Sequence, residues 1–226
     1  MTSSESVSSH HIPILLEPIT DFLTEGLCAI SPDKKPGLIV DCTLGGGGHT
    51  ASILQKIQKQ NNAVKHKVLA TDQDPEAIRR AKSRFARELG EGLLEIHPLP
   101  FSRVLDAVGD RPIYGLMADL GISSDQIDSE SRGFSFRYPA PLDMRMNPNA
   151  GQPLETLLET WSETELADLI WKYGEERHSR KIARRMIDRR ERGELPRDSK
   201  SLADLIAGVF PPAQRHGRIR YPGMGR

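Results

Sequence analysis

The sequence predicts an α/β protein with a Rossmann-like parallel sheet and a second, mainly helical domain. Three observations support this prediction. Short apolar segments alternate with helical segments in the first half of the chain, the first apolar segment is followed by four glycines, and the pattern becomes helical from Leu154 onward. Such alternation is typical of parallel sheets, because parallel strands are joined by crossover connections that usually contain a helix.

The composition indicates a globular protein. The chain has 226 residues, of which 37% are hydrophobic, and can therefore bury a substantial core. Its two cysteines, Cys28 and Cys42, lack the spacing of a zinc site or a disulfide framework, and no apolar run approaches the roughly 18 residues of a membrane helix. We expect a cytoplasmic protein without a membrane partner, in which the polar residues 1–10 form a disordered tail.

Charge is unevenly distributed, although the chain has 31 basic and 31 acidic residues. Residues 171–226 contain 15 lysines and arginines against 7 acidic residues, whereas residues 125–170 contain 3 against 9. This asymmetry indicates a polyanion-binding face rather than a uniformly basic protein.

The first strand is expected at residues 38–40, and residues 51–57 have helical spacing. Asp41 and the glycines at residues 45–48 lie between them, at the kind of turn where open α/β sheets bind ligands. Because glycine loses more backbone entropy on ordering than any other residue, four in a row indicate that a ligand passes close to the backbone. A flexible loop is the alternative, although Gly-rich linkers normally have polar flanks.

Three further strands are expected. The second covers residues 68–70 and is followed by an amphipathic helix that begins at Pro75, the third lies in GLLEIHPLPFSRV, and the fourth lies in YGLMADLGISS and ends at Asp119. Parallel strands have their carboxyl ends at the same edge of the sheet. The groups expected on this rim are Asp41, Asp72, the turn at residues 98–101, and Asp119.

The pattern changes after Ser124. The segment up to Pro153 is rich in Pro, Gly and aromatic residues without a clear period, which predicts a long loop, and loops of this length are usually functional. Four helical segments follow. Ser162 and Glu165 have the spacing of a capping box, and Ser199 is a predicted N-cap.

A glycine turn after the first strand and an acid after the second occur in sites for NAD(P), FAD and S-adenosylmethionine (SAM), in which the acid binds ribose hydroxyls. The dinucleotide fingerprint is incomplete here, because Thr50 occupies the position of its last glycine. Carboxylates at Asp41 and Asp119 suit a cationic sulfonium better than a pyrophosphate. An NAD(P)-dependent oxidoreductase of similar fold is one alternative.

Six motifs occur in order along the chain: HIPILLEPI, VDCTLGGGGHT, ATDQDPEAI, PFS, ADLGISSDQID and RGFSFRYPAPLDMRMN. Together they resemble the bacterial 16S rRNA cytosine-N4 methyltransferase family called RsmH or MraW, from about His11 to near Phe210. The last two motifs are highly specific. The resemblance implies a SAM-binding methyltransferase domain at residues 11–124 and a substrate-recognition domain at residues 125–215.

The resemblance implies SAM as cofactor and methyl transfer to the exocyclic N4 of a cytidine in the decoding region (P site) of 16S rRNA, without a metal. The exocyclic amine of cytosine is a poor nucleophile, and a carboxylate that accepts an N4 hydrogen would make it more reactive. Asp119 is therefore the candidate catalytic residue; alternatively, Asp119 only holds SAM. The implied SAM contacts are Gly47, Gly48, His49, Asp72, Phe101, Asp119 and Gln126. For His49, a helix-capping role is the alternative to a contact with SAM.

An RNA substrate suggests further candidates. A target base must leave its stack to be methylated, and aromatic side chains in the loop can stack on the unstacked base. Ordinary packing of the loop is an equally good explanation for the presence of these aromatic residues. Arg145 either binds a phosphate or forms an internal ion pair. A basic helix stripe is expected to contact RNA phosphates, with a solvated helix face as the alternative. The aromatic candidates are Phe134, Phe136 and Tyr138, and the stripe consists of Arg177, Arg180, Lys181, Arg184 and Arg185.

The match to the family is lost at residues 218–226, where family members continue with further strands of the sheet. Residues 216–226 are therefore interpreted as a truncated return to the first domain. A sheet without these strands has an open apolar edge beside the SAM site, so weak or absent activity is expected. A non-catalytic RNA-binding or ribosome-assembly factor is the second alternative. The sequence leaves open the oligomeric state, including a homodimer, and whether the substrate is naked 16S rRNA or the small ribosomal subunit.

Overall fold

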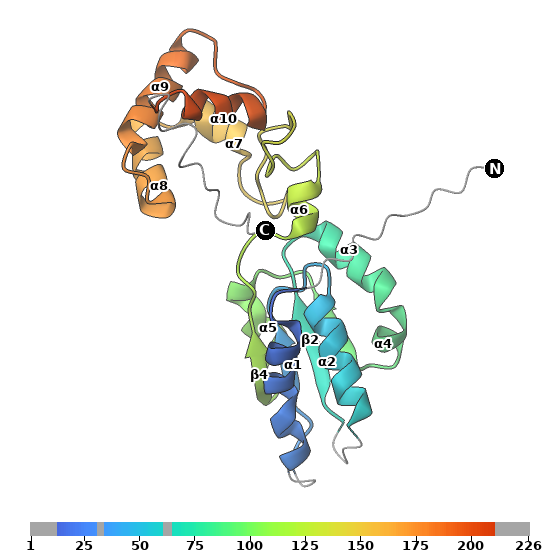
Figure 1. The fold of residues 1–226 in the computed structure, drawn as a ribbon. Helices are drawn as coiled ribbons and strands as arrows, with labels where there is room; N and C mark the ends of the chain where they lie inside the picture. The colour runs from blue at the N-terminus through green and yellow to red at the C-terminus, as the bar shows by residue number, and fades with distance from the viewer. Residues whose placement is uncertain (1–12, 31–33, 61–64, 211–226) are drawn as a thin grey trace, which may run out of the picture. The chain divides into compact units, whose positions relative to one another are not determined.

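The computed structural model of the chain describes residues 13–30, 34–60 and 65–210 (Figure 1). The expected tail at residues 1–10 and the segment 216–226 lie outside these residues. The chain divides into two compact units, Met1–Ser124 and Asp125–Arg226, each of which is described by itself.

The first unit contains a parallel sheet of four strands in the order β3-β2-β1-β4. The strands are β1 (Leu38–Asp41), β2 (Lys67–Thr71), β3 (Leu94–His97) and β4 (Ile113–Met117). All three strand pairings are parallel, which confirms the predicted Rossmann-like sheet. The strand order reverses between β1 and β4, and ligands of open α/β sheets bind at the carboxyl ends beside such a switch point.

Helices connect the strands of this unit. The helix predicted after the glycines is α2, and the helix predicted at Pro75 is α3, whose N-cap Asp74 accepts a hydrogen bond from the backbone N–H of Glu76 (3.0 Å). The helices and 3₁₀ turns are α1 (Leu16–Glu25), η1 (Gly26–Ala29), α2 (Gly48–Lys59), α3 (Pro75–Arg84), α4 (Ala86–Gly90), η2 (Phe101–Arg103) and α5 (Val104–Val108), and α6 (Ser124–Asp128) begins at the last residue of this unit.

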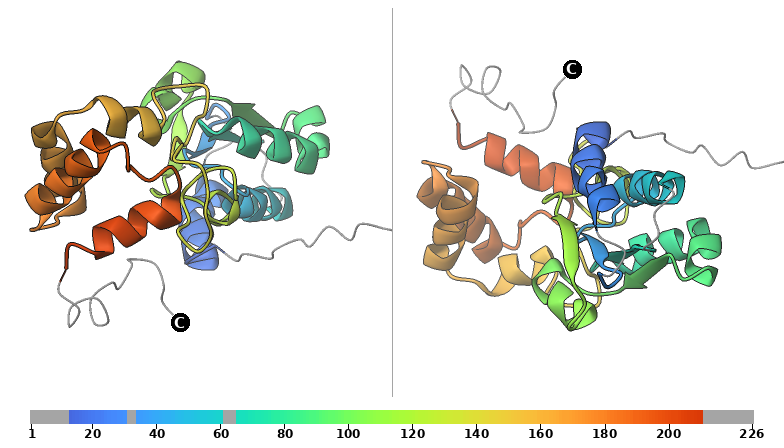
Figure 2. Two further views of the ribbon diagram at one scale, coloured as in Figure 1. Left: turned by 90° about the horizontal axis from the view of Figure 1, so that it is seen from above. Right: turned by 90° about the horizontal axis from the view of Figure 1, so that it is seen from below.

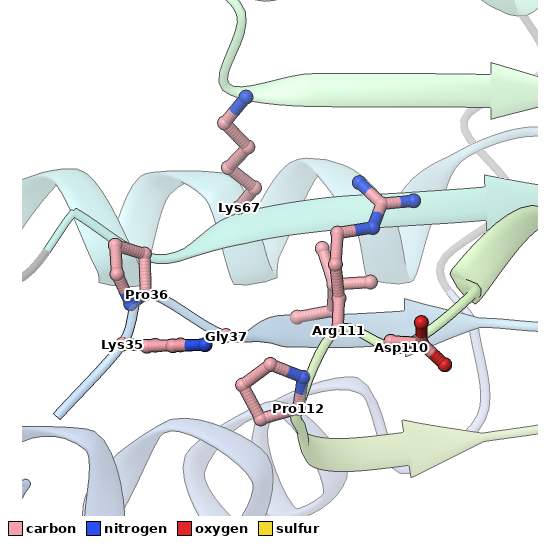
Figure 3. Close-up of a pocket in the computed structure, with 8 residues that line it drawn as sticks. Lys35, Pro36, Gly37, Lys67, Asp110, Arg111 and Pro112 are labelled. Atoms are coloured by element: carbon pink, nitrogen blue, oxygen red, sulfur yellow. The ribbon is translucent and has the colours of Figure 1, made fainter.

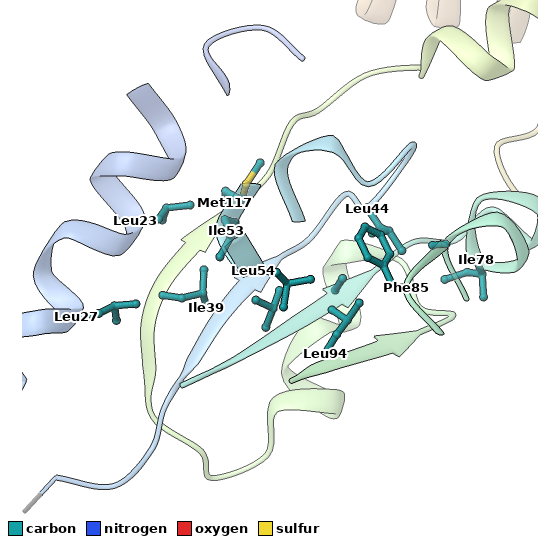
Figure 4. Close-up of a cluster of buried hydrophobic side chains, with 13 residues drawn as sticks. Leu23, Leu27, Ile39, Leu44, Ile53, Leu54, Ile78, Phe85, Leu94 and Met117 are labelled. Atoms are coloured by element: carbon teal, nitrogen blue, oxygen red, sulfur yellow. The ribbon is translucent and has the colours of Figure 1, made fainter. Parts of the chain in front are cut away.

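Both faces of the sheet are covered. Ile39 points to the larger core, which contains side chains of α1, α2 and α3 (Figure 4). Leu38 and Val40 belong to a smaller core against α5. Figure 2 shows α1 and α2 on one face of the sheet and α5 on the other. Burial on both faces explains why β1 is a continuous apolar run rather than an alternating one.

The strand β4 is an edge of the described sheet. It exposes Ile113, Tyr114 and Leu116, the last at 49% of its surface. The open apolar edge expected from the sequence is therefore present at β4.

The second unit is mainly helical. Its core joins the four predicted helical segments, and Ser162 and Glu165 form the predicted capping box. The predicted N-cap at Ser199 is wrong: Asp198 is the N-cap and accepts a hydrogen bond from the Ser201 N–H (2.9 Å), while the Ser199 hydroxyl donates to the Ser135 carbonyl (2.5 Å). The helices are α7 (Leu154–Thr160), α8 (Glu163–Gly174), α9 (Ser179–Glu191) and α10 (Ser199–Ala207).

The predicted loop after Ser124 begins with α6, and beyond it, up to Pro153, it contains neither a helix nor an extended strand among its described residues. A single antiparallel bridge between Pro141 and Asp198 ties it to the start of α10. In the described ranges, no helix is both long enough and apolar enough to span a membrane.

Candidate functional site

The glycine turn after β1 is attached to the end of β2. The Leu44 N–H donates to the Thr71 carbonyl (2.9 Å), and the Gly45 N–H donates to Oδ2 of Asp72 (2.8 Å). The other carboxylate oxygen of Asp72, Oδ1, accepts a hydrogen bond from the Asp74 N–H (2.9 Å). Asp72 therefore fixes the glycine turn.

Two of the glycines are required by the protein's own side chains. Gly47 has a φ of +74°, and a Cβ atom at this position would lie 2.7 Å from the ring of Phe85. A Cβ atom at Gly48 would lie 2.4 Å from the ring of Pro13. The interpretation that the glycines serve only the approach of a ligand is therefore incomplete, because close packing within the chain also demands them.

His49 lies in the first turn of α2 and is 7% exposed. Its Nε2 atom is buried and has no hydrogen-bond partner among the described residues. An unsatisfied buried polar atom costs about 1–3 kcal/mol, and a hydrogen bond from a ligand would remove this cost. The N-cap of α2 is Gly47, so the capping role considered for His49 is not seen.

Asp41 is buried beneath the glycine turn. Its carboxylate is 1% exposed and accepts hydrogen bonds from the Thr43 N–H at Oδ1 (3.1 Å) and from the Thr50 hydroxyl at Oδ2 (2.7 Å). Burial raises the pKa of Asp41, and the hydrogen bonds from Thr50 and Thr43 oppose this shift in part. The expectation that Asp41 faces a ligand at the rim is wrong, because β1 is central in the sheet and α2 covers its last residue.

Asp119 lies two residues beyond β4, so the expectation that the strand ends at Asp119 is also wrong. The last bond between the ends of β1 and β4 runs from the Cys42 N–H to the Met117 carbonyl (2.9 Å). Beyond it, the Asp119 N–H donates to the hydroxyl oxygen of Thr43 (2.7 Å). This bond holds the Asp119 main chain, although the residue as a whole is exposed.

The rim in the first unit brings together most of the expected SAM contacts. Gly47, Gly48 and His49 follow β1, Asp72 follows β2, and Asp119 follows β4. Phe101 begins η2 after β3 and is 52% exposed. Gln126 is buried in α6, in the sequence range of the second unit.

Thr43 and Thr50 belong to the site although the sequence motifs did not single them out. The spacing of Asp41 and Thr43 is that of an Asx-type turn, in which a carboxylate bonds the backbone two residues on, and this signal could have identified Thr43. The contact of Thr50 with Asp41 depends on how α2 packs against β1, for which the sequence holds no local signal.

A cavity of about 400 Å³ lies at the opposite, amino-terminal ends of the strands (Figure 3). None of the expected site residues lines it, and Arg111, which does, is paired with Glu95 (2.8 Å). The residues that line this cavity are Lys35, Pro36, Gly37, Leu38, Lys67, Asp110, Arg111 and Pro112.

In the part of the chain that the structure describes, no group of three or more His, Cys, Asp or Glu residues is placed to hold a metal ion.

The loop of the second unit is held by internal polar contacts. Arg145 forms two hydrogen bonds with the Asp143 carboxylate (2.9 and 2.7 Å), which lower the pKa of Asp143. The ion-pair alternative for Arg145 is therefore the one seen. The Tyr138 hydroxyl donates to the Ile127 carbonyl (3.1 Å), and Phe134 and Phe136 are half-buried.

Four of the five residues of the expected basic stripe lie on α9, opposite the residues that α9 buries, whereas Arg177 precedes the helix, which begins at Ser179. Four side chains of the stripe are exposed: Arg177, Arg180, Lys181 and Arg184. Arg184 also contacts Glu163 of α8 (3.3 Å). Arg185 is half-buried, and its Nε atom is enclosed without a partner among the described residues.

The profile of the MraW methylase family matches residues 8–223, almost the whole chain, so the expectation that the match is lost from residue 218 onward is wrong. The chain belongs to the MraW methylase family. This MraW-family chain is also similar to curated proteins named ribosomal RNA small subunit methyltransferase H. The protein from Synechococcus elongatus is 41% identical over 219 residues, which are 96% of this chain and 66% of the relative.

Two further relatives carry the same name. The protein from Prochlorococcus marinus (strain NATL2A) is 43% identical over 217 residues, which are 96% of this chain and 66% of the relative. The protein from Xanthomonas campestris pv. campestris is 38% identical over 201 residues, which are 89% of this chain and 54% of the relative. The chain thus spans just under two thirds of the length of the first relatives it matches.

Proposed function

We propose that this protein is a SAM-dependent methyltransferase that methylates the exocyclic N4 of a cytidine in the decoding region (P site) of 16S rRNA. Membership of the MraW methylase family and the name of the relatives support an rRNA methyltransferase. The observation that carries the proposal is that the unsatisfied Nε2 of His49, which follows β1, and the exposed Asp119, which follows β4, both lie at the carboxyl ends of these two neighbouring strands.

The residues at the rim fit SAM. When bound, SAM supplies an electrophilic methyl group on a positively charged sulfur. The buried Nε2 of His49 can hydrogen-bond a polar group of the amino-acid part. Each oxygen of Asp72 accepts one main-chain N–H, and because an ionised carboxylate has about four acceptor positions, Asp72 can still accept bonds from ribose hydroxyls. Phe101 offers an exposed aromatic face beside β3.

Asp119 acts on the methyl acceptor. Its carboxylate accepts a hydrogen from the cytosine N4 amine, which restores lone-pair character to the nitrogen and directs it toward the methyl group. This arrangement combines orientation with modest general-base assistance and needs no covalent intermediate.

The second unit supplies the RNA contacts. The loop aromatics Phe134 and Phe136 are half-buried and retain surface for an unstacked base, whereas the Tyr138 hydroxyl is engaged within the loop. The exposed residues of the α9 stripe bind RNA phosphates, which is consistent with the excess of basic residues in this part of the chain.

The test is SAM titration followed by mass mapping of methylated nucleotides in 16S rRNA, presented both as naked RNA and in small ribosomal subunits. We expect SAM to bind and a single decoding-region cytidine to gain one methyl group, at a low rate because the apolar edge at β4 is open. SAM binding without transfer in either substrate would favour the non-catalytic RNA-binding alternative. Binding of NADH instead of SAM, measured by calorimetry, would favour the oxidoreductase.

The α9 stripe predicts a defined salt dependence of RNA binding. In the double variant Arg180→Ala/Lys181→Ala, the negative slope of log affinity against log salt is expected to become shallower by about 0.7–0.9 for each RNA phosphate that the variant no longer neutralises. Lys59→Ala, which removes an exposed basic residue from α2 in the first unit, is the matched control and should leave the slope unchanged. Equal slopes for the double variant and the wild type would assign the stripe to a solvated helix face.

A further inference from the structure

Beyond their last shared hydrogen bond, the chain segments that follow β1 and β4 are joined by Thr43. The segment after β1 enters the glycine turn, and the segment after β4 leads to Asp119. The Thr43 hydroxyl oxygen accepts the Asp119 N–H at 2.7 Å, a short distance for a bond from an amide N–H. Thr43 therefore bridges the two segments beside the switch point.

Thr43 is itself held in place. Its own N–H donates to Oδ1 of the buried Asp41, and the second oxygen of Asp41 accepts the hydroxyl of Thr50 in α2. A chain of hydrogen bonds thus runs from the first turn of α2, through the end of β1, to the main chain of Asp119. Thr50 and Asp41 are buried, Thr43 is half-buried and Asp119 is exposed, so a buried, hydrogen-bonded base supports an exposed residue.

We infer that Thr43 is a positioning residue for Asp119: it holds the Asp119 main chain so that the carboxylate is aimed at the methyl acceptor. This inference rests on the proposed function. Thr43 is the half-buried link between the buried Asp41 and the exposed Asp119, and without its hydroxyl the Asp119 N–H loses its bond to the segment that follows β1. A shift of about 1 Å in a catalytic group can reduce the rate on the order of 10²-fold.

The test compares Thr43→Val, which keeps the side-chain shape but removes the acceptor, with Thr43→Ser, which keeps the hydroxyl. Single-turnover methyl transfer is expected to fall 10- to 100-fold in Thr43→Val, on the order of the loss that a misplaced catalytic group causes, and to recover in Thr43→Ser. Thr160→Val is the matched control, because the Thr160 hydroxyl also bonds a backbone group (Thr156 carbonyl, 2.8 Å) but lies in α7.

A second readout does not depend on activity. In Thr43→Val, the Asp119 amide is expected to exchange its hydrogen roughly fivefold faster or more, since it loses its acceptor, while SAM affinity and melting temperature stay close to those of the wild type. Should Thr43→Val not fold, Thr43→Ala serves for the same two measurements. Unchanged Asp119 exchange, or equal losses of transfer in the Val and Ser variants, overturns the inference.

The two proposals fail in different ways. If the wild type transfers no methyl group, the proposed function fails, whereas the exchange experiment still reports on the bond from Asp119 to Thr43. If the wild type is active and Asp119→Asn is impaired but Thr43→Val is not, only the positioning role of Thr43 is refuted.

Discussion

The variant Asp119→Asn is expected to transfer methyl groups about 10²–10⁴-fold more slowly than the wild type, the range typical for loss of a group that assists proton transfer. The asparagine keeps the backbone N–H that Thr43 accepts, so the loop geometry is preserved and only the carboxylate is lost. Single-turnover transfer of tritium from labelled SAM to small-subunit RNA measures the effect.

Two comparisons make this result specific. Asp110→Asn removes an exposed carboxylate at the amino-terminal ends of the strands and is expected to leave transfer unchanged. SAM affinity, measured by calorimetry, separates the two roles of Asp119. A loss of affinity in Asp119→Asn that accounts for the whole loss of transfer would show that Asp119 only holds SAM, contrary to the proposed catalytic role.

Gly47→Ala is expected to destabilise the first unit by about 2–5 kcal/mol. An alanine in the left-handed conformation costs about 1–2 kcal/mol, and overpacking a filled site costs about 1–3 kcal/mol more. The added methyl group would meet the Phe85 ring at 2.7 Å, and Phe85 belongs to the main core and is only 4% exposed. Chemical denaturation measures the loss of free energy of unfolding.

Gly45→Ala is the matched control, because Gly45 also has a positive φ (+49°) but a Cβ atom there would meet nothing closer than the Thr43 carbonyl oxygen at 3.9 Å. It should show the backbone cost alone. Equal destabilisation by the two substitutions would mean that the contact with Phe85 does not constrain Gly47.

The sequence predicts the framework of the first unit because its signals are local. The apolar run of β1 and the glycines after it place a strand and a helix start without reference to the rest of the chain. Pro75 and the capping box at Ser162 are likewise signals within a single turn. These elements formed where they were expected.

The site residues depend on contacts across the sheet, which the sequence does not encode locally. Asp41 and Asp119 were expected on the same rim, yet Asp41 is enclosed by α2 and Asp119 is exposed beyond β4. The difference arises because β1 has a neighbour on both sides, whereas β4 is an edge. Ser199 shows the same limit: its hydroxyl bonds the distant Ser135 carbonyl, which leaves the cap to Asp198.

The central claim is that the carboxyl ends of the parallel strands hold SAM, and hydrogen–deuterium exchange with and without SAM tests it most directly. Peptides that cover residues 44–50 and Asp72 should become protected when SAM is added. Peptides around Lys35 and Arg111, which line the cavity at the opposite ends, should not change. Protection confined to that cavity, or no protection at the glycine turn at saturating SAM, would contradict the claim.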